Sequence, residues 1–189
     1  TIEEHPLAPG SRLRVEVRRP GRATEFPLVI FLPGASGMAA ARPAFELVSA
    51  ALVEQDIGAV HLDYLADDPG HPLALNDIAA RAQGWRAAVS AALDFVNTHY
   101  PVSRYCPITL GYSFGGFLAV SHAAHDRRVC GSVIISGGID PLTLSEKRPL
   151  PPMLIFHGEA DQIVPPMSGG QLASYLGQQG TACDLRLLP

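Results

Sequence analysis

Hydrophobic residues in this chain gather into short continuous runs, each followed by a turn that contains glycine. The three clearest runs are Leu28–Leu32, Cys130–Ile135 and Met153–Phe156. Runs of this length are typical of strands that are covered on both faces of a sheet. Weaker runs predict further strands at 59–64, 108–111 and 183–188. The period-two pattern of residues 13–17 predicts an edge strand.

Between these runs, apolar residues recur every three or four positions, as they do on one face of an amphipathic helix. The first predicted helix presents Phe45, Val48 and Leu52 on such a face. Further helices of this kind are predicted at 78–96, 115–125 and 172–176. Strands that alternate with helices need crossover connections, which give parallel pairing. The sequence therefore predicts an α/β fold, an open and mostly parallel sheet with helices on both faces and functional groups at the carboxyl ends of its strands.

The length and composition fit one globular domain that spans residues 1–189, with residues 65–75 as a short cap or rim loop. Of the 189 residues, 47% are hydrophobic and 17% are charged, which favours a buried core over disorder. The net charge is −4 without any run of Lys or Arg, so nucleic acid is not an expected partner. No apolar run approaches the roughly 18 residues of a membrane span. A cytoplasmic protein is expected, with a signal peptide already cleaved as the alternative.

Cysteine and histidine residues show no spacing typical of a metal site, so neither a metal ion nor an organic cofactor is expected. The three cysteines lie on or beside apolar runs and are interpreted as small buried core residues: Cys106, Cys130 and Cys183. His122 and His125 are expected to face water near the end of a helix, whereas His61 is expected to be packed and hydrogen-bonded.

The segment Gly111–Gly116 reads Gly-Tyr-Ser-Phe-Gly-Gly and matches the pattern G-x-S-x-G. It lies where a predicted strand meets a predicted helix. A tight turn of this kind lifts the Ser113 hydroxyl above the sheet, and the flanking glycines leave room for an unusual backbone conformation. The free N–H groups of the following helix can stabilise an oxyanion. These features predict Ser113 as a nucleophile, and the alternative is a glycine-rich turn without chemistry.

An acidic loop, His157–Pro165, follows the predicted strand at 153–156. A carboxylate in this position can bind an imidazole and fix its tautomer. Asp161 is the preferred candidate, because Glu159 lies nearer the end of the strand. His157 is interpreted as part of a structural turn.

A glycine-containing loop, Leu32–Gly37, follows the predicted strand at 28–32 and can aim a backbone N–H at the same oxyanion. Ala35 is the preferred donor, with Ser36 as the alternative. The N–H of Phe114, the residue after the nucleophile, supplies the second donor. Three residues that flank these groups are predicted to contact the substrate: Ser36, Tyr112 and Ile163.

In these three segments the chain resembles the dienelactone hydrolase branch of the α/β-hydrolase superfamily, which is related to prolyl-oligopeptidase-like esterases. The similar order of elements extends from about residue 12 to the end of the sequence. Two differences stand out. Dienelactone hydrolases proper carry a cysteine at the position of Ser113, and the oxyanion loop of these hydrolases usually begins His-Gly where this chain has Pro33-Gly34. The serine favours an esterase-like activity.

The expected reaction is transfer of the acyl group of a small carboxylic ester to water, with a lactone, a thioester or a short peptide derivative as alternative substrates. The order Ser, Asp, His of this superfamily places the base after Asp161, whereas the last histidine in the sequence is His157. We therefore expect the catalytic histidine beyond Pro189 and a C-terminal segment of the fold that this sequence lacks. The alternative from another class is a non-catalytic protein of the same fold that acts as a binding or scaffold module.

Overall fold

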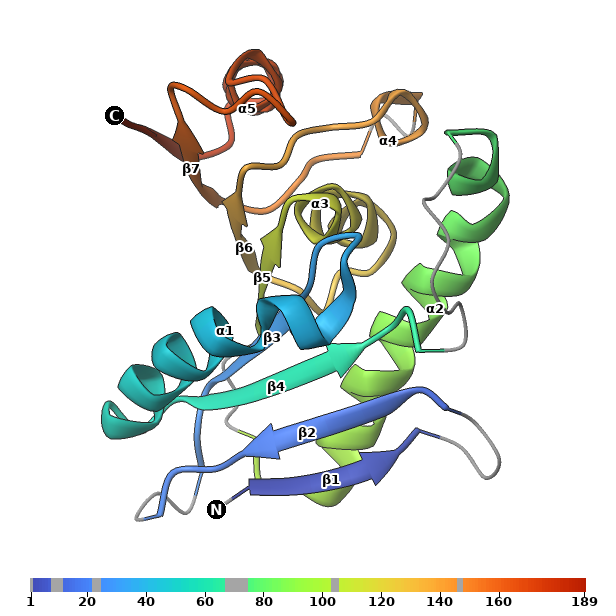
Figure 1. Cartoon of the computed structure of the whole chain (residues 1–189), viewed down its shortest axis with the longest axis vertical. Helices are drawn as coiled ribbons and strands as arrows, with labels where there is room; N and C mark the ends of the chain where they lie inside the picture. Colours follow the sequence, from blue (N-terminus) through green and yellow to red (C-terminus); the bar gives the residue numbers. More distant parts are fainter. Residues whose placement is uncertain (1, 8–11, 22–24, 67–74, 103–105, 146–147) are drawn as a thin grey trace.

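Eight strands form one sheet with the order β1-β2-β4-β3-β5-β6-β7-β8 (Figure 1). The computed structural model describes residues 2–7, 12–21, 25–66, 75–102, 106–145 and 148–189. The strands are β1 (Ile2–Pro6), β2 (Arg14–Arg18), β3 (Leu28–Leu32), β4 (Gly58–Asp63), β5 (Ile108–Tyr112), β6 (Gly131–Ile135), β7 (Met153–Gly158) and β8 (Cys183–Leu188). The described helices are α1 (Gly37–Glu54), α2 (Leu75–His99), α3 (Phe114–His125), α4 (Pro141–Ser145) and α5 (Met167–Gln178).

In the spatial order of the sheet, the neighbouring strands β4, β3, β5, β6, β7 and β8 all pair in parallel. β1 and β2 extend the β4 edge through antiparallel pairing. The predicted open and mostly parallel α/β sheet is therefore confirmed. The prediction that residues 13–17 form the edge strand is wrong, because β1 lies outside β2. Strand β1 and the short helix α4 were not predicted from the sequence. Alternate side chains of β1 are solvent-exposed, so its sequence carries almost no apolar pattern.

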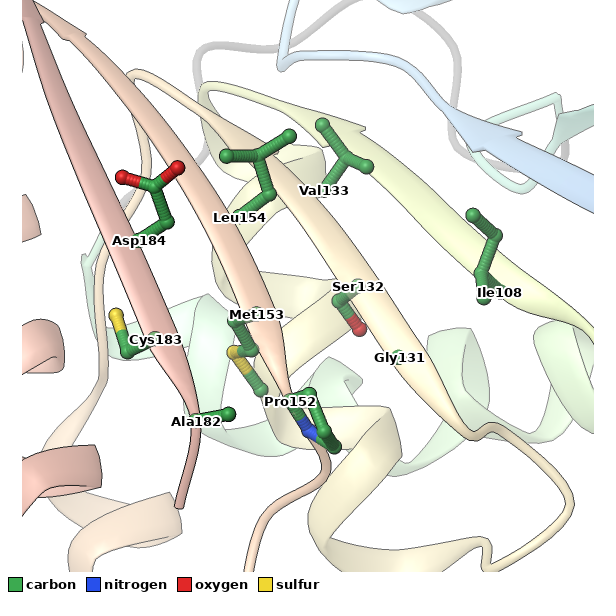
Figure 2. Close-up of a pocket in the computed structure, with 10 residues that line it drawn as sticks. All are labelled: Ile108, Gly131, Ser132, Val133, Pro152, Met153, Leu154, Ala182, Cys183 and Asp184. Atoms are coloured by element: carbon green, nitrogen blue, oxygen red, sulfur yellow. The ribbon is translucent and has the colours of Figure 1, made fainter.

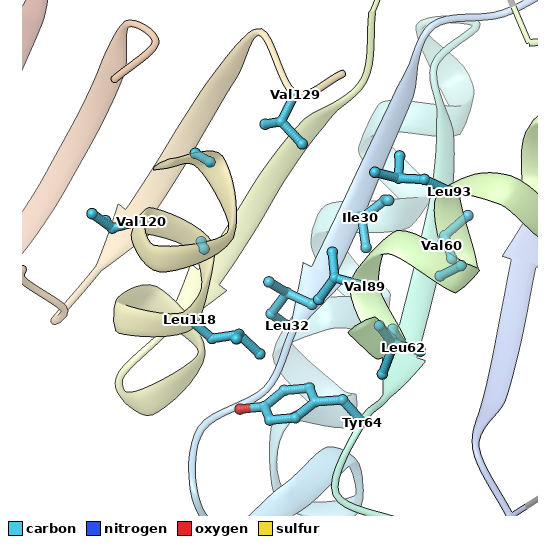
Figure 3. Close-up of a cluster of buried hydrophobic side chains, with 14 of the residues drawn as sticks. Ile30, Leu32, Val60, Leu62, Tyr64, Val89, Leu93, Leu118, Val120 and Val129 are labelled. Atoms are coloured by element: carbon cyan, nitrogen blue, oxygen red, sulfur yellow. The ribbon is translucent and has the colours of Figure 1, made fainter. Parts of the chain in front are cut away.

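Helices cover both faces of the sheet. On one face, α2 and α3 pack against the buried side chains of the central strands, and Figure 3 shows this core around Ile30, Leu62 and Val89. On the other face, α1 covers Phe31 through its own Phe45. The prediction that Val48 shares the buried face of α1 is wrong, because Val48 is 40% exposed. The buried stripe of α1 instead consists of Met38, Ala41, Phe45 and Ser49.

The face that α1 covers is open over the later strands. The register aligns Leu110, Val133, Leu154 and Asp184 in one row across β5, β6, β7 and β8. These last strands line an open groove of about 440 Å³ on this face (Figure 2). Helix α5 packs against β7 and β8.

Cys106 and Cys130 form a disulfide that joins the segments leading into β5 and β6. Both residues are exposed, and Cys183 is a half-buried free thiol. The interpretation of the cysteines as buried core residues is therefore wrong. This disulfide could not be predicted from the sequence, because the two cysteines are far apart along the chain. They meet only because parallel strands bring their starting ends together across an intervening helix.

Two further expectations concern the rim loop and the absence of a membrane span. Most of the predicted rim loop at 65–75 lies outside the described residues, since 67–74 are not among them. None of the described helices is long and apolar enough to cross a membrane.

Candidate active site

Ser113 occupies the turn between β5 and α3. Its backbone has φ of 52° and ψ of −119°, a left-handed conformation that non-glycine residues rarely adopt. The Ser113 N–H donates to the Ile135 carbonyl at 2.8 Å, and the Ser113 carbonyl accepts from the Gly116 N–H at 2.9 Å. These bonds hold the strained residue in place, and the half-buried side chain lies at the carboxyl end of β5.

The glycines of this segment are required by close approach of other backbone atoms. A Cβ atom on Gly111 would lie 2.2 Å from the Gly115 carbonyl oxygen. A Cβ atom on Gly115 would lie 2.1 Å from the Leu32 carbonyl oxygen. The predicted role of these glycines as space for a tight strand-to-helix turn is confirmed.

The loop after β3 lies directly against Ser113. A Cβ atom on Gly34 would be 3.2 Å from the Ser113 Cβ. The Gly37 N–H donates to the Gly34 carbonyl at 2.9 Å and closes a turn that presents Ala35 at the surface. Phe114 is the first residue of α3, so its N–H has no acceptor within the helix. Both predicted donors of the oxyanion hole therefore belong to segments that meet at Ser113.

Asp161 lies in the loop after β7 and is held as a carboxylate. The N–H groups of Val164 and Ile163 each donate to Asp161 Oδ1 at 3.0 Å, and these bonds hold the pKa of Asp161 below its usual value. Because β5, β6 and β7 are parallel neighbours, Ser113 and Asp161 both lie at the carboxyl edge of the sheet. This placement agrees with the prediction from the sequence. The N–H of Glu159, the candidate that was not preferred, donates to the Leu188 carbonyl at 2.7 Å.

Ser136 links the turn of the nucleophile to the acidic loop, and sequence analysis missed it. Its φ is 49°, and its N–H donates to the Phe156 carbonyl at 2.9 Å. Its side chain hydrogen-bonds Asp161, which lowers the pKa of that carboxyl further. The preceding carbonyl, that of Ile135, accepts from Ser113. The available signal was the sequence Ser-Gly-Gly at the carboxyl end of a buried strand.

The three residues predicted to contact substrate lie on the same edge of the sheet. Tyr112 is the last residue of β5 and is 45% exposed, and Ile163 follows Asp161 and is 89% exposed. Ser36 is exposed at the turn before α1, without a side-chain capping bond. Their contact with a substrate stays a prediction.

His157 Nε2 lies 3.8 Å from Asp161 Oδ2, but its hydrogen bond goes to another group. Nε2 is 2.7 Å from the Val164 carbonyl, which can only accept, so Nε2 carries the proton. Nδ1 faces α5, where a Cβ atom on Gly169 would lie 2.8 Å from it. The ring is 1% exposed. This geometry supports the interpretation of His157 as a structural residue.

The other histidines discussed above lie in different parts of the molecule. The expectation that His122 faces water is wrong: it is 1% exposed and hydrogen-bonds Ser90 at 3.1 Å, because α2 packs over this part of α3. His125 is exposed, as expected. Among the described residues, no hydrogen bond joins a histidine to Ser113, and no group of three potential ligands could hold a metal ion.

A second serine–histidine pair lies between α1 and β4. His61 Nε2 is 2.6 Å from Ser49 Oγ, and Ser49 donates its own proton to the Phe45 carbonyl at 2.6 Å. Ser49 is 0% exposed. A substrate cannot reach this hydroxyl, so the pair stabilises the core, and the packed, hydrogen-bonded His61 is confirmed.

Comparison with solved structures shows the same fold. An α/β hydrolase enzyme from a Medee basin deep-sea metagenome library has a TM-score of 0.73 and 14% identity, over 100% of this chain and 81% of that one. A carboxylesterase from Lactobacillus plantarum gives 0.75 and 13%, over 100% and 82%. Est1E from Butyrivibrio proteoclasticus gives 0.71 and 18%, over 94% and 84%. No curated protein matches the sequence.

The mostly parallel sheet, together with these structural relatives, defines an α/β-hydrolase fold. The family model of the dienelactone hydrolase family matches residues 75–189, which is more than half of the chain. The chain therefore belongs to the dienelactone hydrolase family. The matched range includes both Ser113 and Asp161.

Proposed function

We propose that this protein is a serine hydrolase that cleaves small carboxylic esters through an acyl-enzyme at Ser113. The observation that carries the proposal is the strained Ser113 at the junction of β5 and α3, directly before Phe114, the first residue of the helix. Strain of this kind persists at functional sites because the surrounding structure enforces it. Membership of a hydrolase family supports the same class of reaction.

The reaction has two acyl-transfer steps. Ser113 Oγ attacks the ester carbonyl carbon while a histidine takes its proton, and the carbonyl oxygen becomes an oxyanion. The N–H groups of Phe114 and Ala35 donate to that oxyanion. The histidine returns the proton to the departing alcohol, and water then attacks the acyl-enzyme by the same route. Asp161 orients the histidine and stabilises its charged form.

The order of triad residues in this superfamily places that histidine after Asp161, where the 189-residue sequence has none. The base is therefore not assigned to a described residue. Activity should be compared between the 189-residue chain and any longer product of its gene. Full activity of the 189-residue chain would contradict this placement, and His157→Gln would then be the first variant to test.

A small ester suits the open rim around Ser113. Apolar side chains are exposed there on both sides, at Tyr112 and at Ile163, and can pack against an acyl chain or an aromatic acid. Est1E has been solved with ferulic acid bound. A panel of p-nitrophenyl esters with acyl chains of increasing length, together with methyl ferulate, would define the preferred acyl group.

Ser113→Ala tests the proposal directly. We expect ester hydrolysis to fall by roughly 10⁶-fold while the thermal unfolding temperature changes little, since only the nucleophile is lost. A fluorophosphonate probe should label the wild-type protein and not Ser113→Ala. Ser49→Ala is the matched control, because it removes a buried hydroxyl that hydrogen-bonds a histidine, and it should still be labelled.

Two outcomes would count against the proposal. Substantial ester turnover by purified Ser113→Ala would exclude this nucleophile. A folded gene product that has a histidine after Asp161, and that neither hydrolyses esters nor reacts with the probe, would support the other hypothesis, a non-catalytic binding or scaffold protein with a hydrolase fold.

A further inference from the structure

Tyr64 is a buried residue that the reaction described above does not use. It follows β4 directly, is 2% exposed and belongs to the core shown in Figure 3. Its hydroxyl donates to the Pro33 carbonyl at 2.6 Å. Burial raises the pKa of Tyr64 far above its usual value, so the hydroxyl stays protonated and acts as a donor.

The accepting carbonyl lies in the loop that presents Ala35. Pro33 has no N–H of its own, so this loop can be fixed at Pro33 only through its carbonyl or its ring. The carbonyl defines the plane of the peptide that leads into Gly34, and Gly34 lies against Ser113. A bond that fixes the Pro33 carbonyl therefore also fixes the direction of the Gly34 N–H in the same peptide plane, one residue before the Ala35 N–H.

The Tyr64 ring contacts the second segment of the oxyanion hole. Its centroid is 6.4 Å from that of Phe114 and 6.4 Å from that of Trp85. Trp85 in turn packs edge-on against Phe114 at 5.0 Å. The three rings therefore form a small and largely buried aromatic cluster, which reaches the Ser113 turn through Phe114.

One more contact shows how close the two segments are. A Cβ atom on Gly115 would lie 2.5 Å from the Pro33 carbonyl oxygen, so this oxygen lies between the start of α3 and the Tyr64 hydroxyl. Donors in an oxyanion hole act well only when they are held within about 0.5 Å of the productive position. Tyr64 touches both segments that carry the donors.

We propose that Tyr64 is a positioning residue that holds the Pro33–Gly37 loop and Phe114 at a fixed separation, and thereby sets the geometry of the oxyanion hole. The inference rests on the proposed function. Sequence analysis did not single out Tyr64, because a tyrosine after a buried strand has no pattern of its own. The alternative interpretation is a core tyrosine whose hydroxyl contributes only to stability.

Tyr64→Phe separates these interpretations, because it keeps the ring and removes the donor. We expect kcat to fall roughly 10-fold while KM changes by less than about twofold, since the lost geometry matters most when the oxyanion forms. Affinity for a trifluoromethyl ketone, to whose carbonyl a serine hydroxyl adds to form an oxyanion, should fall by the same factor as kcat/KM. A purely structural role would lower only the unfolding temperature.

Tyr100→Phe is the matched control. Tyr100 is also buried, and its hydroxyl donates to Glu3 at 2.9 Å near the N-terminal strand, away from Ser113. This variant should lose stability without a change in kcat or in ketone affinity. The single tryptophan, Trp85, lies in the cluster, so its fluorescence reports whether the packing of Tyr64→Phe is intact.

Trp85→Phe is a second variant in case Tyr64→Phe does not fold. It loosens the ring contacts and leaves the hydroxyl bond, so kcat should fall less than roughly 10-fold. A larger loss in Trp85→Phe than in Tyr64→Phe would assign the effect to ring packing and overturn the role of the hydroxyl. Unchanged kcat and ketone affinity in folded Tyr64→Phe would overturn it while leaving the proposed function intact. A folded gene product that has a histidine after Asp161 and still lacks hydrolase activity would end both.

Discussion

Two serines with left-handed backbone conformations mark the candidate site at the scale of single residues. Ser113 has φ of 52° and Ser136 has φ of 49°, and they end the adjacent strands β5 and β6. Each such residue costs on the order of 1–3 kcal/mol unless the surroundings offset the strain. The Ser113 N–H donates to the carbonyl of Ile135, the residue before Ser136, so one hydrogen bond links the two strained turns. Both residues lie at the carboxyl edge of the sheet, where the loop that carries Asp161 also begins.

Asp161→Asn is the prediction that belongs to this scale. The change keeps the size of the side chain but removes the charge that orients and stabilises a histidine, so kcat should fall by roughly 10⁴-fold. Steady-state kinetics with p-nitrophenyl esters would measure the loss. Glu159→Gln is the matched control two residues away, and it should retain wild-type kcat. Equal losses in both variants would mean that the acidic loop, not the Asp161 carboxylate, supports activity.

At the scale of elements, the unit that carries Ser113 is closed by a covalent bond. The Cys106–Cys130 disulfide spans 24 residues and encloses β5, the Ser113 turn and α3. The disulfide is also relevant to the cellular compartment of the protein, because disulfides persist in oxidising compartments and are rare in the cytosol. The expected cytoplasmic location stays a prediction, and this disulfide argues against it.

Removing the disulfide should destabilise the protein without altering the residues proposed for catalysis. We expect the double variant Cys106→Ala/Cys130→Ala to lose about 3 kcal/mol of unfolding free energy, from the closure entropy of a loop of this length. Urea denaturation with and without a reductant would measure it. Reductant should lower the wild-type midpoint and leave that of the double variant unchanged. Cys183→Ala, which removes the free thiol, should show the wild-type response to reductant.

The elements themselves were largely predictable, for a physical reason that also explains the errors. β3 is buried on both faces, and β6 and β7 carry apolar residues on the open face as well, so all three sequences are continuous apolar runs. β1 lies at the edge and α4 has only five residues, so neither buries enough side chains to show a pattern. The Ser113 turn was predictable because its glycines are demanded by local contacts. Tyr64, Ser136 and the disulfide were not, because each depends on segments brought together only by the parallel sheet.

At the scale of the whole molecule, two buried histidines report on the packing of opposite faces of the sheet. His61 lies between β4 and α1, and His122 lies between α3 and α2. Each bonds a serine hydroxyl that donates its own proton to another acceptor, so each histidine is a neutral donor through Nε2. Burial lowers the pKa of each from the usual 6.5 to about 4. The folded protein therefore resists protonation at both positions.

This resistance predicts how stability depends on pH. Between pH 6.5 and 4 the unfolded chain binds protons at His61 and His122 that the folded chain does not, so the free energy of unfolding should fall as pH falls through this window. The slope should approach about 1.4 kcal/mol per pH unit for each histidine. Urea denaturation at pH 8, 6.5, 5.5 and 4.5 measures it. His61→Gln, which keeps a donor for Ser49, should reduce the slope, whereas exposed His99→Gln should not. A free energy of unfolding that stays constant from pH 7 to 4.5 would contradict the burial of neutral histidines on both faces.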